Sequence, residues 1–472
     1  MKENPYRQER EEMKELLTQY NNFKSGKKFN FIEEESFERI IDYYDDNDKL
    51  PYALEAAGYA VEQFPYSSSL FIKKADILIA SQLYQEGLAV LEKAEALGSK
   101  DINLYILKTD VYLALDNQER AAFILEQAIH VFEGDEKIEL LFELADVYDD
   151  YEEFDKVFNC LKLILKQDPT NEEALYKICF WTDYTGKNEE SIRLHLRIID
   201  EHPFNQLAWF NLGAAYQGLK LYEKSIDAYL YAVAIDEKFD YAYRNLGDAY
   251  LRLRKYREAI EALQKVLELS MPEEVIYEAL GHCYEKLKNP AQARFHYRKA
   301  VHLNSEDSHL HYKIAGTYMQ EGYWENAIKN LNSAMSINRS NPDFHFALAE
   351  CYVQLNAIKD AVIHFTHFIK ARPKNSKGWK ELVKCLYNAE YFEEALEQVK
   401  NAQSNTGDKP LFAYYRAAIL FSLGKSKEAI IHLQNAIKVS PSLVKYFVEL
   451  DPSLLQSSTI SSIITAGKRK KK

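Results

Sequence analysis

The sequence predicts an all-α fold, a solenoid built from antiparallel pairs of helices. At 472 residues the chain exceeds what a single hydrophobic core usually organises. Gly (16) and Pro (12) are scarce and no Ser/Gly-rich linker is present, which argues against globular units joined by flexible segments. The side-chain pattern also recurs every 34 residues. An uninterrupted array of helical repeats accounts for all three observations.

The repeat is clearest around Trp209. A leucine, a glycine and a tyrosine follow this anchor at offsets +3, +4 and +7, and a small residue, Ser225, follows at +16. Every step between anchors is 34 residues except the step from Tyr105 to Leu141, which is 36 and adds two loop residues. The twelve anchors are Phe37, Phe71, Tyr105, Leu141, Leu175, Trp209, Tyr243, Tyr277, His311, His345, Trp379 and Ala413.

Each repeat is predicted to contain two amphipathic helices. Offsets 0, +3, +4 and +7 share one helical face, and offsets +16, +20 and +23 share another after a break. The residue at +16 is small in eleven of the twelve repeats, Val157 being the exception, so the two helices can approach closely. A proline at +28 ends the second helix in five repeats.

With this period, its aromatic anchors, Leu212-Gly213, Tyr216, the small +16 residue and the closing proline, the sequence resembles the tetratricopeptide repeat family. The resemblance covers residues 34–441. It implies a right-handed superhelix whose first helices line a concave face, and a role in holding another protein. It does not imply any particular partner, since the family serves many processes.

The two ends are expected to cap the array. Residues 1–33 should form an N-terminal helix around Gln8 to Tyr20, and 34–441 the twelve repeats. Residues 442–467 should form a capping helix near Leu443 to Leu450 and a tail, and 468–472 a solvated basic tail.

Composition narrows the cellular setting and the partner. The net charge of −13 disfavours a nucleic acid or an anionic membrane as ligand, because both require clustered Lys and Arg. No stretch is apolar enough for secretion or for membrane insertion, so we expect a cytoplasmic protein, with a composition that looks bacterial. The five cysteines form no C-x-x-C pair and are expected to be reduced packing residues.

The binding face is predicted from the offsets that point away from the core of each first helix, namely −2, +1, +2, +5, +8 and +9. In the first four repeats these offsets hold twelve acidic residues against two basic ones, whereas the other eight repeats balance. A concave acidic wall would favour a basic peptide or domain. The alternative is that these are ordinary solvated helix faces. The candidate charged residues are Asp42, Asp76, Asp110, Glu143, Asp146, Asp149, Asp150, Lys177, Arg244 and Lys313.

Two asparagines, Asn211 and Asn245, occupy offset +2 in adjacent repeats. A side-chain amide there can donate to and accept from a peptide backbone, unless it is only an exposed spacer. The clamp for a C-terminal carboxylate that is best known in the family is not supported. Phe210 and Ala214 stand where that clamp has Lys and Asn, so the tail of a heat-shock chaperone is not the expected ligand.

The last repeat presents an uncharged stripe that includes Tyr414 and Tyr415. The stripe could contact a partner or a second copy. Alternatively, the C-terminal segment folds back onto it through the apolar side chains Leu454, Leu455, Ile460, Ile463 and Ile464.

We find no sequence motif for catalysis, a metal or a cofactor. A phosphate-binding loop, a nucleophile elbow, a zinc-protease motif and a calcium loop are all missing. The close pair His364 and His367 lacks a convincing third ligand. We therefore predict a non-catalytic scaffold or adaptor that binds a peptide or protein. The alternatives are a structural homo-oligomer and a chaperone-like holder of a basic client.

Overall fold

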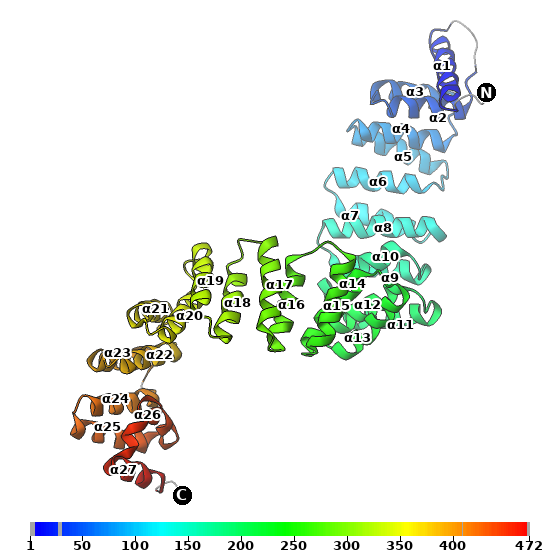
Figure 1. Ribbon diagram of the computed structural model, residues 1–472. Coiled ribbons are helices and arrows are strands. Elements are labelled where there is room, and N and C mark those ends of the chain that lie inside the picture. Colours follow the sequence, from blue (N-terminus) through cyan, green and yellow to red (C-terminus); the bar gives the residue numbers. More distant parts are fainter. Residues whose placement is uncertain (1–4, 27–30, 408, 470–472) are drawn as a thin grey trace. The chain divides into compact units, whose positions relative to one another are not determined.

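The computed structural model describes residues 5–26, 31–407 and 409–469. In this part of the chain there are twenty-seven α-helices and two short 3-10 helices, and no strand. Consecutive helices run antiparallel and pack as pairs (Figure 1). The predicted all-α solenoid of helix pairs is confirmed.

Twelve helix pairs follow the predicted frame. The first helices are α2 (Glu34–Asp45), α4 (Ser68–Ala80), α6 (Ile102–Ala114), α8 (Gly134–Asp150), α10 (Glu172–Thr185), α12 (Gln206–Gly218), α14 (Asp240–Arg252), α16 (Glu274–Lys286), α18 (Ser308–Gln320), α20 (Pro342–Gln354), α22 (Ser376–Asn388) and α24 (Pro410–Ser422). The second helices are α3 (Leu50–Gln63), α5 (Tyr84–Ala96), α7 (Gln118–Ala128), α9 (Phe154–Gln167), α11 (Asn188–Glu201), α13 (Tyr222–Ile235), α15 (Tyr256–Leu269), α17 (Pro290–Leu303), α19 (Trp324–Ile337), α21 (Ile358–Ala371), α23 (Phe392–Thr406) and α25 (Ser426–Val439). Each anchor lies in a first helix, and each +16 residue is buried in a second helix.

The helix ends have local causes. Asparagine or aspartate precedes many first helices, and its side chain accepts a hydrogen bond from a backbone N–H that the helix leaves free. Asn171 Oδ1 accepts from the Ala174 N–H at 3.0 Å, and Asn205 Oδ1 from the Ala208 N–H at 2.9 Å. At offset +11, between the two helices, every repeat has a residue of positive φ. Glycine fills this left-handed position in only three repeats, and residues such as Lys288 fill it elsewhere.

A tyrosine ring of the second helix packs directly on the backbone of the first helix in two repeats. A Cβ atom added at Gly281 would lie 2.5 Å from ring carbons of Tyr297, and one added at Gly213 would lie 2.6 Å from those of Tyr229. Both tyrosine rings are fully buried. The glycine at offset +4 and the large residue at +20 are therefore complementary.

The chain divides into two compact units, residues 1–242 and 243–472. The first begins with α1 (Pro5–Lys24), which covers the outer side of α2. The buried ring of Tyr20 meets that of Phe37 edge to face at 6.3 Å, and Phe23 meets it at 6.0 Å. No helix in the described residues is both long and apolar enough to cross a lipid bilayer.

The second unit ends in two helices after the last repeat. These are α26 (Val444–Leu450), which packs on α24, and α27 (Ser458–Arg469), which packs on α25. Ile460 and Ile464 of α27 are buried, so the predicted tail contains a helix of its own. The last three lysines of the predicted basic tail, 470–472, lie outside the described residues.

The close packing at offset +4 yields a stability prediction. Gly281→Ala should lower the free energy of unfolding by about 1–3 kcal/mol, because the new methyl group overpacks the Tyr297 ring. The matched control is Gly316→Ala in α18, where a Cβ meets nothing within 4 Å. That change should be neutral or should stabilise by roughly 0.5–1 kcal/mol. Denaturant titrations of both variants measure the difference, and equal midpoints would contradict the packing argument.

Candidate functional site

We use the term first-helix face for the side chains at offsets −2, +1, +2, +5, +8 and +9 of the first helices. In the N-terminal unit its most regular feature is a row of four aspartates at offset +5, one in each of four successive repeats. We call this row the acidic ladder; it consists of Asp42, Asp76, Asp110 and Asp146. Consecutive first helices contact each other from α2 through α8, so the four carboxylates occupy neighbouring positions.

The carboxylates of the ladder influence one another. Shielding from water and the charge of Asp45 raise the pKa of Asp76. Shielding and the charge of Asp76 raise the pKa of Asp110. Shielding, Asp110 and Asp146 do the same for Glu143. The negative charges of four repeats therefore form one continuous field.

In the part of the chain that the structure describes, lysines form ion pairs only with the two ends of the ladder. Lys73 pairs with Asp42, and Lys177 lies 3.7 Å from Asp146 while pairing with Glu173 at 2.9 Å. Among the described residues, Asp76 and Asp110 form no ion pair. The middle of the ladder is thus the part with the largest uncompensated charge.

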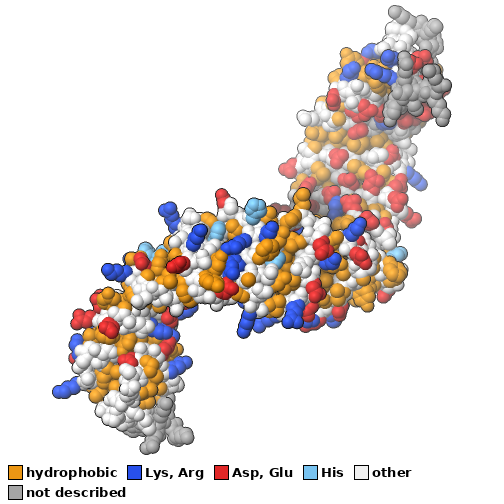
Figure 2. Space-filling model, in the orientation of Figure 1, with side chains coloured by type: hydrophobic (Ala, Val, Ile, Leu, Met, Phe, Trp, Pro, Cys, Tyr) orange, Lys and Arg blue, Asp and Glu red, His pale blue; other side chains and the backbone are white. Residues whose placement is uncertain are grey.

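Asp149 and Asp150 lie beyond the ladder, in the last turn of α8, and both are exposed. Shielding and the charge of Asp150 raise the pKa of Asp149. Figure 2 shows acidic side chains spread over the displayed side of the N-terminal unit. The structure therefore brings all seven acidic candidates of the sequence analysis onto one series of adjacent helices.

The first-helix face continues into aromatic residues that the sequence analysis missed. Tyr176, Phe180 and Tyr184 lie at offsets +1, +5 and +9 of α10, and each is 60% exposed. The rings of Phe180 and Tyr184 stack with their centroids 6.0 Å apart. We call these three residues the aromatic stripe. Phe180 occupies the next +5 position after Asp146, so the offset frame would have found the stripe if aromatic residues had been counted beside charges.

Asn211 does not face a partner, which corrects its predicted role. Its side chain is only 2% exposed. Its Nδ2 donates to the carbonyl oxygen of Leu175 at 2.7 Å and lies 3.2 Å from Nε2 of His195. The amide therefore ties α12 to α10 and α11. Asn245 belongs to the other unit and is half-buried.

The neighbour of Asn211 is an unusual core residue. His195 is completely buried, and its Nδ1 lies 2.8 Å from the carbonyl oxygen of Ser191. An Nδ1–H that donates to this carbonyl leaves Nε2 to accept from Asn211. Burial lowers the pKa of His195 to about 4, so the ring is neutral at physiological pH.

The basic candidates of the C-terminal unit are already paired. Arg244 donates from Nη1 and Nη2 to the two carboxylate oxygens of Glu273 at 2.8 and 2.6 Å. Lys313 pairs with Glu278 on the preceding first helix. These charges hold neighbouring repeats together, and they leave the first-helix face of this unit without a ladder of one sign.

Tyr414 and Tyr415 are fully buried, which corrects their predicted role as a contact surface for a partner. The hydroxyl of Tyr414 donates to the Ser440 carbonyl at 2.8 Å. The ring of Tyr415 meets Tyr446 of α26 edge to face at 6.3 Å. The chain itself thus covers this stripe: Tyr415 meets α26, and Leu454, Ile460, Ile463 and Ile464 of the C-terminal segment belong to the same hydrophobic cluster as the two tyrosines.

Comparison with family profiles identifies the repeat. Profiles of the tetratricopeptide repeat match residues 183–238, 240–271 and 275–307, and a further profile described as a TPR repeat matches 315–356. The chain contains tetratricopeptide repeats. The helix pairs outside these segments follow the same offsets, as the buried +16 residues show.

Solved structures similar to this chain are distant in sequence. One is YrrB, described as a TPR protein with an unusual peptide-binding site, with 20% identity and a TM-score of 0.36 over 39% of this chain and 95% of that one. MamA matches with 20% identity and a TM-score of 0.35 over 36% and 94%. The C-terminal part of a repeat protein from Cytophaga hutchinsonii matches with 15% identity and a TM-score of 0.45 over 54% and 98%. No curated protein sequence matches this chain.

The buried histidine makes stability depend on pH. Because its folded pKa of about 4 lies below the ordinary value near 6.5, the neutral ring favours folding above pH 6.5. This contribution, on the order of 3 kcal/mol, is lost progressively as the pH falls from about 6.5 to 4. His195→Gln should therefore lose less stability than the wild type between pH 7 and pH 5. Denaturant titrations at both values test this, with the exposed His130→Gln as a control that should behave as wild type.

For the acidic ladder we predict the opposite dependence of stability on pH. Since the folded state raises the pKa of Asp110, its charge opposes folding at neutral pH, and the fold gains relative stability as the pH falls through that pKa. Asp110→Asn should therefore raise the melting temperature at pH 7 and lose this advantage near pH 3. Glu92→Gln, on the exposed side of α5, should leave the melting temperature unchanged. A lower melting temperature for Asp110→Asn would show that the ladder stabilises the fold instead.

Proposed function

We propose that this protein is a non-catalytic scaffold whose N-terminal unit binds a basic segment of another protein. The acidic ladder and the aromatic stripe are its proposed site. The observation that carries the proposal is the row of offset +5, in which four aspartates are followed by the exposed ring of Phe180. Protein binding is the general role of tetratricopeptide repeats, and the proposed setting is the cytoplasm.

The chemistry of the site favours arginine over lysine in the partner. A guanidinium group bonds a carboxylate through two parallel N–H donors and also stacks on an aromatic face. The ladder offers the first kind of contact and the stripe offers the second. A lysine ammonium would gain from the charge of the ladder but less from Phe180 and Tyr184. The expected partner is therefore an arginine-containing segment.

The spacing of the ladder also restricts the conformation of the partner. Packed helices lie about 8–10 Å apart, so successive ladder carboxylates are separated by a similar distance. A polyproline II segment advances roughly 3.1 Å per residue and returns to the same side every third residue. If arginines stood at every third position, such a segment would present one arginine to each aspartate of the ladder. A concave wall, as the family resemblance implies, would strengthen this field.

The alternative of a structural homo-oligomer loses its main support. It depended on apolar terminal faces or on an uncovered stripe in the last repeat, and Tyr414 and Tyr415 of that stripe are buried within the chain. A chaperone-like holder would use the same acidic ladder as an adaptor. It differs in its partner, because a holder binds its client before the client folds whereas an adaptor binds the folded protein.

The proposal is tested with a labelled ten-residue peptide that carries arginine at positions 1, 4, 7 and 10. The triple variant Asp76→Asn, Asp110→Asn, Asp146→Asn should bind it at least ten-fold more weakly, because it removes three carboxylates of the ladder. Fluorescence anisotropy at 50 and 200 mM salt measures this, and wild-type affinity should fall as salt rises.

The matched control carries the same change of charge on the exposed sides of second helices: Glu86→Gln, Glu92→Gln, Glu119→Gln. It should bind the peptide as the wild type does. Phe180→Ala should weaken the arginine peptide more than a peptide with lysine at the same four positions. If the triple variant and its control bind equally, the ladder is not the site. If a peptide of the same composition with adjacent arginines binds as tightly, the extended register is wrong.

A further inference from the structure

The short helix α26 lies across the first-helix face of the last two repeats, on α22 and α24. Phe447 is fully buried, and its ring lies 6.0 Å from that of Phe421. Tyr387 of α22 donates to Asp451, the residue that follows α26, at 3.2 Å. Thus α26 occupies the surface that, in the other repeats, is the first-helix face.

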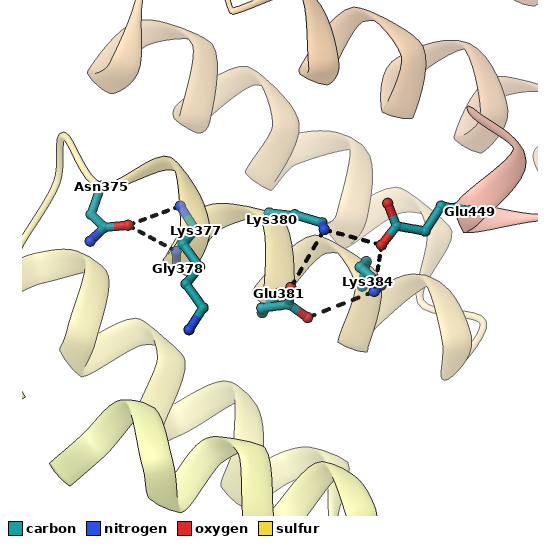
Figure 3. Close-up of polar contacts among 7 residues, drawn as sticks. All are labelled: Asn375, Lys377, Gly378, Lys380, Glu381, Lys384 and Glu449. Carbon is teal, nitrogen blue, oxygen red and sulfur yellow. Dashed lines mark hydrogen bonds and ion pairs between the residues drawn. The ribbon is translucent and has the colours of Figure 1, made fainter. Parts of the chain in front are cut away.

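One carboxylate of α26 is bound by two lysines of this face. Nζ of Lys380 and Nζ of Lys384 each lie 3.0 Å from Oε1 of Glu449, and Figure 3 shows both side chains directed at it. Glu381 of α22 is a more distant partner of the same lysines, at 3.9 and 3.8 Å. Burial opposes ionisation of Glu449, but the hydrogen bonds from Lys384 and Lys380 outweigh it and lower its pKa. The pair of lysines is therefore a built carboxylate site.

The fit of α26 on this surface is incomplete. Tyr415 is fully buried, yet its hydroxyl has no hydrogen-bond partner among the described residues. Buried hydroxyl groups nearly always have one, because leaving them unpaired is costly. The ring of Tyr415 meets that of Tyr446, and Nζ of Lys380 lies 5.4 Å from the centre of the Tyr446 ring, so Tyr415 lies beside the carboxylate site. A helix with a better-placed acceptor would satisfy Tyr415 where α26 does not.

The carboxylate site also extends beyond α26. A cavity of about 540 Å³ adjoins it, and no residue of α26 lines that cavity. Lys384 and Glu381 form one side of it, and Met319 and Trp324 form an apolar side. Lys384 is thus shared by the bound carboxylate and the cavity. A ligand longer than α26 could use both.

We propose that the first-helix face of α22 and α24 is a second protein-binding site, for an acidic amphipathic helix, and that α26 occupies it until such a helix replaces it. The ligand would carry two adjacent aromatic residues and a carboxylate three residues after the first of them, as Tyr446, Phe447 and Glu449 do in α26. This ligand is opposite in charge to the one proposed for the acidic ladder. The inference does not depend on that proposed function.

The partner is a different protein rather than a second copy of this chain. A second copy would offer the same seven-residue helix, with the same lack of an acceptor for Tyr415 and the same failure to reach the cavity. In the intact chain α26 competes at the high effective concentration that a covalent link provides. Binding from outside is therefore expected to be weak until the hold on α26 is loosened.

The experiment uses the full chain and a labelled synthetic peptide of residues 441–456. Wild type should bind this peptide weakly, and Glu449→Gln should bind it at least ten-fold more tightly, because the internal helix loses its hold on the two lysines. Lys380→Glu with Lys384→Glu should abolish binding, and a peptide with Glu449→Lys should restore it. Hydrogen exchange of residues 444–450 should be faster in Glu449→Gln than in wild type. Circular dichroism and melting confirm that each variant is folded.

The matched control is Lys425→Glu with Lys427→Glu, two exposed lysines at the start of α25, which should bind the peptide as wild type does. Equal binding by wild type and Glu449→Gln would overturn the proposal and make α26 only a structural cap. Binding that survives Lys380→Glu with Lys384→Glu would also overturn it. If light scattering shows that Glu449→Gln dimerises instead of binding the peptide, the partner is a second copy and the proposal is wrong.

Discussion

The structure depends on how closely the two helices of a repeat approach each other. The residue at offset +16 is buried in all twelve repeats, and in eleven it is Ala, Gly or Ser. Where offset +4 is glycine, the second helix places a large side chain on the backbone of the first, as Tyr297 does at Gly281 and Leu263 at Gly247. Each repeat packs its own two helices together and packs against its neighbouring repeats, so the array extends one repeat at a time. Most of the first-helix face is then free to vary, because it lies outside this contact; the buried Asn211 is an exception.

The sequence was sufficient to predict the contact between the two helices of a repeat, because a residue that is buried in every copy leaves a periodic signal. It was insufficient where a residue departs from its position's usual environment. Asn211 was assigned to the exposed face by its offset, but His195 takes the place of a tyrosine or leucine at +20 and offers a buried nitrogen that draws the amide inward. The aromatic stripe was not predicted, because the prediction of the binding face rested on charged residues alone. Helix α27 escaped because Ser and Thr mask its apolar face, which Ile460 and Ile464 bury.

The first-helix face carries different chemistry in the two units. In the described residues of the N-terminal unit, aspartates follow one another at the same offset, and lysines form ion pairs only with the two ends of this row. In the C-terminal unit lysines and glutamates alternate and pair, and two lysines of α22 bind a carboxylate of the chain's own α26. One backbone repeat thus supports first-helix faces of different charge in the two units. This separation is available because each repeat contacts only its neighbours, so changes in one segment do not disturb another.

The turn between the helices of each repeat has a practical consequence for engineering. At offset +11 the backbone adopts positive φ in all twelve repeats, and nine of these positions hold a residue other than glycine. The residues other than Asp and Asn among them, such as Lys220 and Lys288, each cost on the order of 1 kcal/mol relative to glycine. Offset +11 lies outside both the contact between the two helices and the first-helix face. Glycine substitutions at these positions should therefore raise the free energy of unfolding. They would offset the lower stability of variants made to change binding.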